Sequence, residues 1–139
     1  MTGGFRLLSH TADLGIESWG PDLGGALAQA VRAFGVVLAG EGAGRVAEER
    51  RVGLTGDDEE ALLVALLQEA LYLLEAEGWL TVGAALSIDD AGALTGVLLG
   101  EPFDEVRHAE GHAVKAVTWH GLLVEHGAKG VRVEVFLDV

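Results

Sequence analysis

The spacing of the apolar residues changes at Gly78, from a helical period before it to an alternating period after it. Four acidic residues at 57–60 form the predicted first turn of this helix, where the helix dipole favours negative charge. Glycine is typical of a helix end, so Gly78 is expected to stop the helix. The pattern predicts a helix whose apolar face is broad enough to lie on a sheet. The apolar residues at helical spacing are Leu62, Leu63, Leu66, Leu67, Ala70, Leu71, Leu73 and Leu74.

After Gly78 the chain alternates in the manner of β-strands. Turn-like residues at 89–92 and 126–130 link the alternating segments, which favours antiparallel pairing. In the last segment, valine or leucine at every second position shares one face, and Asp138 lies on the opposite face. The predicted strands are 79–88, 94–99, 114–125 and 131–137.

The first part of the chain predicts a second helix and three further strands. Segments 5–8 and 14–19 have the character of short strands, and segment 45–54 is assigned to a strand by elimination. Between them, apolar residues recur at helical spacing over 23–38, with Asp22 as the predicted N-cap. Three glycines inside that helix each cost about 1 kcal/mol against alanine, so tertiary packing has to hold it. They are Gly24, Gly25 and Gly35.

Early helices followed by late hairpins favour an α+β fold. We expect a two-layer sandwich, with a mostly antiparallel sheet packed against two helices. The length of 139 residues predicts one domain over 1–139, large enough to bury one core.

The net charge and the absence of cysteine exclude several kinds of binding partner and catalytic site. The chain has 9 Lys and Arg against 22 Asp and Glu, a formal charge of −13. Such a surface repels phosphates, so direct binding of nucleic acid is not expected, and a basic protein or a cation fits better. The absence of cysteine excludes disulfides, thiolate zinc sites and cysteine nucleophiles. No signal peptide or membrane-length apolar run is present, which predicts a soluble cytoplasmic protein.

Two aspartates stand where predicted strands begin or end. Asp13 follows the sequence His10-Thr11-Ala12 between two short strands, and Asp138 ends a strand that alternates to the chain terminus. As a carboxylate at a strand junction, Asp13 could bind a hard cation. Separately, the Asp138 carboxylate, the terminal carboxylate and a carbonyl oxygen would suit Ca²⁺ or Mg²⁺. The alternatives are a turn in which Asp13 bonds backbone N–H groups, and a frayed end at Asp138.

Two other groups of polar residues precede or occupy the strand at 114–125. His108, Glu110 and His112 would share a face if they lay on a strand and could then hold a transition metal, although a solvated loop is favoured there. Lys115 either points to solvent or reaches an acidic cluster or a phosphate. His120 is either a half-buried structural histidine or part of the same contact surface.

Familiar catalytic motifs are absent. The sequence contains no phosphate-binding loop of the P-loop or dinucleotide type, and no Gly-x-Ser-x-Gly elbow. A triad of Ser9, His10 and Asp13 is discounted, because neighbours on a strand point to opposite faces.

Three segments, taken together, resemble the archease family: His10-Thr11-Ala12-Asp13-Leu14-Gly15-Ile16, residues 114–122 and residues 135–139. They occur in the family's order and spacing, and the resemblance covers nearly the whole chain. It implies a small cytoplasmic α+β protein that assists a GTP-dependent tRNA-splicing RNA ligase of the RtcB type. Archease promotes guanylylation of that ligase and restores its turnover.

The resemblance also implies the site. It assigns a metal site to Asp13 and Asp138, with a main-chain or terminal oxygen from Val139, and a partner or phosphate contact to Lys115. His10 and His120, which lie in the matching motifs, are expected to take part in that contact. The expected metal is Ca²⁺, Mg²⁺ or Mn²⁺.

One departure from the family's pattern concerns Ala113. The family usually has glutamate at this position, so Glu110 is the candidate to substitute for it. Trp119 stands where tyrosine is common, which is a mild change.

Three hypotheses for function follow from the sequence. The first is a non-catalytic activator of the RNA ligase that works through the metal site. The second is a metal-dependent phosphohydrolase that uses Asp13 and Asp138, although the chain lacks a nucleophile motif or a substrate-binding loop. The third is a chaperone-like interaction protein, which would need an exposed apolar patch.

Overall fold

The structure is a computed structural model that describes residues 2–9 and 13–139. Its elements, in chain order, are β1 (Gly4–Ser9), β2 (Asp13–Gly20), α1 (Leu23–Ala39), β3 (Glu48–Leu54), α2 (Glu59–Glu77), β4 (Trp79–Ile88), β5 (Leu94–Pro102), β6 (Ala116–Gly127) and β7 (Gly130–Asp138).

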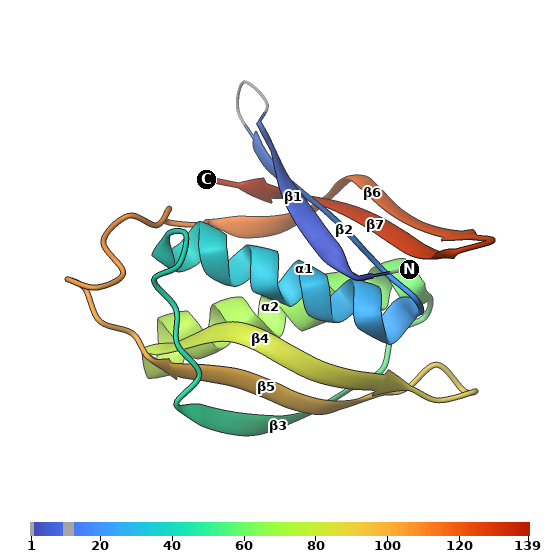
Figure 1. The fold of residues 1–139 in the computed structure, drawn as a ribbon, viewed down its shortest axis with the longest axis horizontal. Coiled ribbons are helices and arrows are strands. Elements are labelled where there is room, and N and C mark those ends of the chain that lie inside the picture. The colour runs from blue at the N-terminus through green and yellow to red at the C-terminus, as the bar shows by residue number, and fades with distance from the viewer. Residues whose placement is uncertain (1, 10–12) are drawn as a thin grey trace.

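The seven strands form two antiparallel sheets, which confirms the α+β class. One sheet has the order β1-β2-β7-β6 and the other the order β3-β5-β4. Figure 1 shows α1 and α2 between the two sheets, so the molecule has three layers where the sequence predicted two. The reason is that α1 is apolar on most of its surface and packs on β2 from one side and on β4 from the other. A helix of this kind needs cover on both sides.

The predicted N-cap of α1 at Asp22 and the predicted end of α2 at Gly78 are confirmed, whereas α2 begins at Glu59, two residues later than predicted. The Asp22 carboxylate accepts a hydrogen bond from the Gly25 N–H at 2.7 Å and caps α1. Asp58 caps α2 in the same way, by accepting from the Ala61 N–H at 2.7 Å. Gly78 ends α2 in the left-handed conformation, with φ of 64°. Capping of this type satisfies backbone groups that a helix end leaves without partners.

The glycines of α1 let the helix approach β4 closely. A Cβ atom on Gly35 would lie 2.7 Å from the Thr81 carbonyl oxygen, and one on Gly24 would lie 2.9 Å from the Leu86 carbonyl oxygen. No side chain fits at either position. The close contact with β4 is therefore the tertiary packing that offsets the low helix propensity of these residues.

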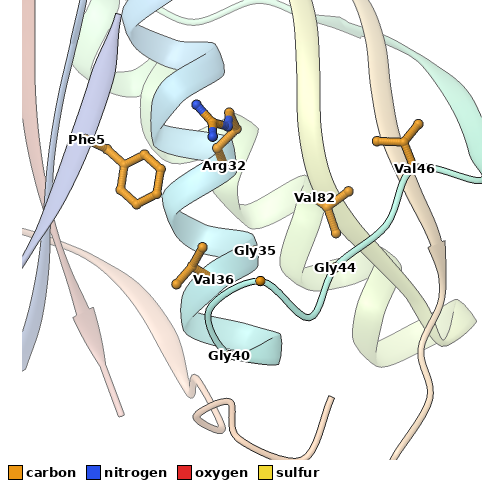
Figure 2. Close-up of a pocket in the computed structure, with 9 residues that line it drawn as sticks. Phe5, Arg32, Gly35, Val36, Gly40, Gly44, Val46 and Val82 are labelled. Carbon is orange, nitrogen blue, oxygen red and sulfur yellow. The ribbon is translucent and has the colours of Figure 1, made fainter. Parts of the chain in front are cut away.

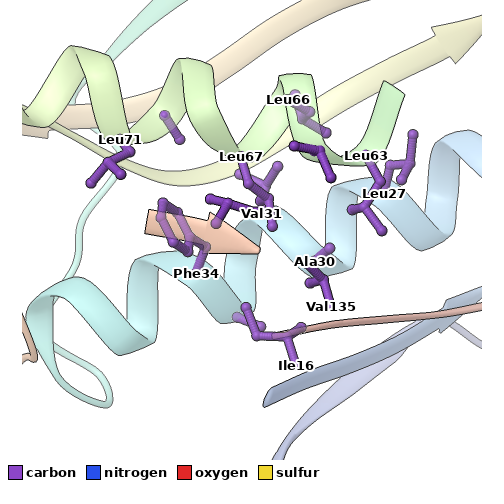
Figure 3. Close-up of a cluster of buried hydrophobic side chains, with 14 of the residues drawn as sticks. Ile16, Leu27, Ala30, Val31, Phe34, Leu63, Leu66, Leu67, Leu71 and Val135 are labelled. Carbon is purple, nitrogen blue, oxygen red and sulfur yellow. The ribbon is translucent and has the colours of Figure 1, made fainter. Parts of the chain in front are cut away.

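The core lies on both sides of the helix layer, where α1 and α2 meet the two sheets. Figure 3 shows Phe34 and Val31 of α1 against Leu67 of α2, with Ile16 and Val135 facing them from β2 and β7. All five side chains are fully buried. The alternation predicted for the last strand is confirmed, since valine or leucine at every second position of β7 is buried. Within the described residues, no helix is both long enough and apolar enough to cross a membrane.

Candidate functional site

Asp13 and Asp138 face each other at one end of the four-stranded sheet. Asp13 is the first residue of β2, Asp138 is the last residue of β7, and the two are direct partners in the antiparallel register. Directly opposed residues project from the same face, with Cβ atoms about 4.5–5.5 Å apart. Because the neighbouring Leu137 is fully buried, alternation turns Asp138 and its partner to the outer face of the sheet.

A second pair of opposed carboxylates lies on the same face of the sheet and can be compared with the Asp13–Asp138 pair. Glu17 and Glu134 are also direct partners, four residues further along β2 and β7. Arg132 bridges them, with Nη1 2.9 Å from Glu17 Oε2 and 2.5 Å from Glu134 Oε2, and Arg6 adds a contact to Glu17 at 2.6 Å. These two arginines neutralise that pair.

The Asp13–Asp138 pair has no such compensation. Neither carboxylate forms an ion pair or a side-chain hydrogen bond with any residue in the described ranges 2–9 and 13–139. Like charges directly opposite each other on a sheet are destabilising. A bound cation would relieve this repulsion, as Arg132 does for the glutamate pair.

Asp138 is held firmly at the chain end. It pairs with Asp13 on one side and with Ala116 of β6 on the other, and its carbonyl oxygen accepts a hydrogen bond from the Lys115 N–H at 2.7 Å. The frayed-end alternative is therefore wrong. Val139 follows directly, so its oxygens stand one residue from the pair.

The backbone N–H of Lys115 lies beside the Asp13–Asp138 pair, but the Lys115 side chain forms no ion pair with either carboxylate. Lys115 is exposed and forms no ion pair with a described residue. The ammonium group is thus available to an external anion. His10, the other predicted contact from the first motif, lies outside the described residues.

His120 does not occupy the half-buried position that a regular strand would give it. It is exposed, in a stretch of β6 where the pairing with β7 is irregular. The alternative of a half-buried structural histidine is therefore wrong.

The oxygen atoms that Asp13, Asp138 and Val139 offer are the ligands that a hard cation prefers. No group of three or more His, Asp and Glu side chains is placed to hold a metal within the part of the chain that the structure describes. Two carboxylates on one face, with main-chain or terminal oxygens of Val139 beside them, would supply oxygen ligands only, which Ca²⁺ and Mg²⁺ prefer. The remaining coordination positions would be open to water or to a partner.

His108, Glu110 and His112 do not converge. His108 is buried, and its Nδ1 accepts a hydrogen bond from the Asp104 N–H at 2.9 Å. His112 is exposed, and Glu110 lies beside Gly40 at the end of α1. The segment is not a strand, so the basis for a shared metal-binding face is absent.

A buried charged cluster around Glu101 was not predicted from the sequence. The Glu101 carboxylate lies 2.8 Å from Nη1 and 2.6 Å from Nη2 of Arg107. It also accepts a hydrogen bond from the Arg45 N–H at 2.6 Å. His108 Nε2 lies 3.2 Å from the same carboxylate. These contacts hold the start of the segment that leads from β5 to Lys115. Only His108 among the four residues belonged to a predicted group, and there it was considered as a metal ligand.

The cluster predicts a specific loss of stability in acid. The hydrogen bond from Arg107, with smaller contributions from Arg45 and His108, lowers the pKa of Glu101 from 4.5 to about 2. Stability from this group is complete above pH 4.5 and is lost as the pH falls towards 2, and it amounts to about 3 kcal/mol. Urea unfolding at several pH values checks it. The difference in unfolding free energy between wild type and Glu101→Gln should shrink between pH 5 and 2.5, and a constant difference would contradict the assignment.

Four surface hollows of the described residues lie away from the Asp13–Asp138 pair. The hollow in Figure 2, of about 250 Å³, is lined by Arg32 over the Phe5 ring, by valines and by glycines of the loop after α1. Three further hollows are lined by residues around Glu101, Glu59 and Lys129. Neither Asp13 nor Asp138 lines any of the four. Asp138 is exposed and Asp13 is half-buried, at the end of the outer face of the sheet.

Comparison with known proteins agrees with this architecture. The solution structure of Methanobacterium thermoautotrophicum protein 1598 is 31% identical, with a TM-score of 0.75, and the match covers 98% of this chain and 99% of that one. A crystal structure from Thermotoga maritima, described as an archease and possible chaperone, shares the fold at 18% identity and a TM-score of 0.61, over 96% of each chain.

Sequence relatives extend the same result. Protein archease of Methanothermobacter thermautotrophicus is 33% identical over 139 residues, which cover 98% of this chain and 99% of the relative. A probable protein archease of Mycobacterium tuberculosis is 33% identical over 99% of this chain and 76% of its own length. The model of the Archease protein family matches residues 5–139. With the motifs, the fold and these relatives in agreement, the chain belongs to the archease family.

Proposed function

We propose that this protein is a non-catalytic, cytoplasmic activator of a GTP-dependent tRNA-splicing RNA ligase of the RtcB type. It acts through a divalent cation, Ca²⁺, Mg²⁺ or Mn²⁺, held by Asp13 and Asp138 with an oxygen of Val139. The observation that carries the proposal is the opposed carboxylate pair, which forms no ion pair with a described residue, on the face where Glu17 and Glu134 are bridged by Arg132. Membership of the archease family supports the choice of partner.

The chain's own residues would bind and orient rather than react. Asp13 and Asp138 hold the cation at the rim of the sheet, and the hydrogen bond from the Lys115 N–H fixes the Asp138 backbone. When bound, such a cation neutralises triphosphate charge. The Lys115 ammonium, which has no ion pair among the described residues, contacts the partner or its phosphate. The acidic surface favours approach to a basic ligase cleft and disfavours bare RNA.

The open position of the pair favours an accessory role over a phosphohydrolase. A hydrolase encloses its substrate, whereas none of the four hollows is lined by the two aspartates. The large apolar side chains exposed in the described part of the chain come from separate elements, including Val46, Tyr72 and Val106. A chaperone-like role would require them to form a continuous patch.

Ligation at limiting ligase tests the proposal. With the purified ligase, GTP, Mn²⁺ and an RNA substrate, addition of this protein should raise ligation from about one product per ligase molecule to many. A parallel arm measures release of phosphate from GTP by the protein alone. Ligation unchanged by the protein, or phosphate release in the absence of ligase, would contradict the accessory role.

Lys115 provides a residue-level prediction. Lys115→Ala should weaken activation about tenfold, and Lys115→Arg should restore only part of it, because a forked guanidinium does not replace a compact ammonium at a close phosphate contact. The measurement is the initial rate of ligase guanylylation at saturating protein. Wild-type rates for both variants would show that Lys115 is only a solvated residue.

A further inference from the structure

The pairing of β6 with β7 is interrupted beside the carboxylate pair. Thr118 pairs with Phe136 and Leu123 pairs with Glu134, so the four residues 119–122 lie opposite Val135 alone. The extra residues form a pronounced bulge. Bulges of this kind redirect side chains and are frequent next to functional sites.

Gly121 shows that the bulge is built into the packing. Its φ is 68°, a conformation that side chains disfavour, and a Cβ atom there would lie 2.8 Å from Cε2 of Phe136. The Phe136 ring also occupies the space beside Gly15, where a Cβ would lie 2.7 Å from Cε1. Two glycines therefore accommodate one aromatic ring on the outer face. The packing of Phe136 against these two glycines therefore coincides with the irregular pairing of β6.

The bulge presents Trp119 to solvent. Its side chain is 59% exposed and has no ring contact, cation–π contact or hydrogen bond with any described residue. Trp79, in contrast, is buried, donates to Glu48 at 2.8 Å and carries the Arg50 guanidinium 4.7 Å from its ring. An exposed tryptophan without an intramolecular partner is unfavourable in water, and tryptophan is enriched among the residues that dominate protein–protein binding.

Strand geometry places Trp119 close to the candidate metal site. Ala116 is the direct partner of Asp138, and Trp119 follows it by three residues, about 10 Å along the strand at most. His120, also exposed, is next to it. The indole and the uncompensated carboxylates therefore belong to one end of the same sheet.

We infer that Trp119, with His120, anchors a basic surface of the partner protein beside the Asp13–Asp138 pair. An indole face attracts guanidinium and ammonium groups, and the net charge of −13 steers a basic surface towards it. The inference rests on the proposed function, because the partner is the ligase, and it adds which part of the molecule makes the contact.

Affinity for the ligase tests the inference, with Tyr72 as the matched control. Tyr72 on α2 is 57% exposed, nearly the same as Trp119, but it lies on a helix outside this sheet. In calorimetric titrations with the ligase in Ca²⁺ or Mn²⁺, Trp119→Ala should weaken binding at least tenfold and Tyr72→Ala less than twofold. Trp119→Lys, which repels a basic surface, should weaken binding more than the alanine variant. Cation binding by each variant alone should equal that of wild type.

The outcomes separate the inference from the proposed function. If wild type does not bind the ligase, the proposed function fails. If wild type binds, equal affinity for Trp119→Lys, or equal losses for the Trp119 and Tyr72 variants, overturns the inference alone. Loss of cation binding in both Trp119 variants also overturns it, since Trp119 would then support the metal site.

Discussion

In the presence of a chelator, Asp138→Asn is expected to unfold at a higher urea concentration than wild type, and with saturating Ca²⁺ the order should reverse. The substitution removes one of two opposed carboxylates that no basic side chain compensates among the described residues. Relief of the repulsion should add up to about 1 kcal/mol without a cation. A cation at 100 times its dissociation constant should stabilise wild type by about 2.7 kcal/mol and leave the variant almost unchanged.

Glu134→Gln is the control for this reversal. Glu134 belongs to the neighbouring carboxylate pair, which Arg132 already neutralises. This variant should be less stable than wild type with or without Ca²⁺, and its response to Ca²⁺ should match that of wild type. If Asp138→Asn gains as much stability from Ca²⁺ as wild type does, the cation binds elsewhere.

Blocking the chain end should also weaken cation binding. The proposed site includes a carboxylate oxygen of Val139, one residue from Asp138, and a hard cation gains affinity from each anionic oxygen. A tag fused directly after Val139 converts that carboxylate into an amide and should reduce Ca²⁺ affinity at least tenfold. The β7 strand should still form, because Val133, Val135 and Leu137 remain buried in the core.

The matched control carries the same tag before Met1. Termini usually tolerate extensions, so this form should bind Ca²⁺ as the untagged protein does. Calorimetric titration of both forms measures the difference. Equal affinities would exclude the terminal carboxylate from the site and leave only the two aspartates.

Local pattern was sufficient to predict most of the elements, whereas the grouping of Asp13 with Asp138 came from the resemblance to the archease family. Capping by Asp22 and termination at Gly78 depend on neighbouring residues, so the sequence predicts both helix boundaries. Alternation in the last strand places Asp138 opposite the buried side chains. That Asp13 is its direct partner follows from the strand order, which the sequence does not specify.

Features that depend on distant contacts escaped prediction. The third layer arises because α1 packs closely on β4, through contacts such as that of Gly35 with the Thr81 carbonyl. The bulge in β6 depends on the fit of Phe136 beneath Gly121, and a regular alternation predicted a uniform strand there. In each case the determining neighbour is more than ten residues away in the chain.

The rate of ligase guanylylation, with wild type, Asp13→Asn/Asp138→Asn and Glu134→Gln compared at equal concentrations, tests the central claim most directly. If activation passes through the Asp13–Asp138 pair, the double variant should leave the ligase at its unassisted rate, and Glu134→Gln should activate as wild type does. Circular dichroism is used to check that each variant is folded. Full activation by the folded double variant would contradict the account.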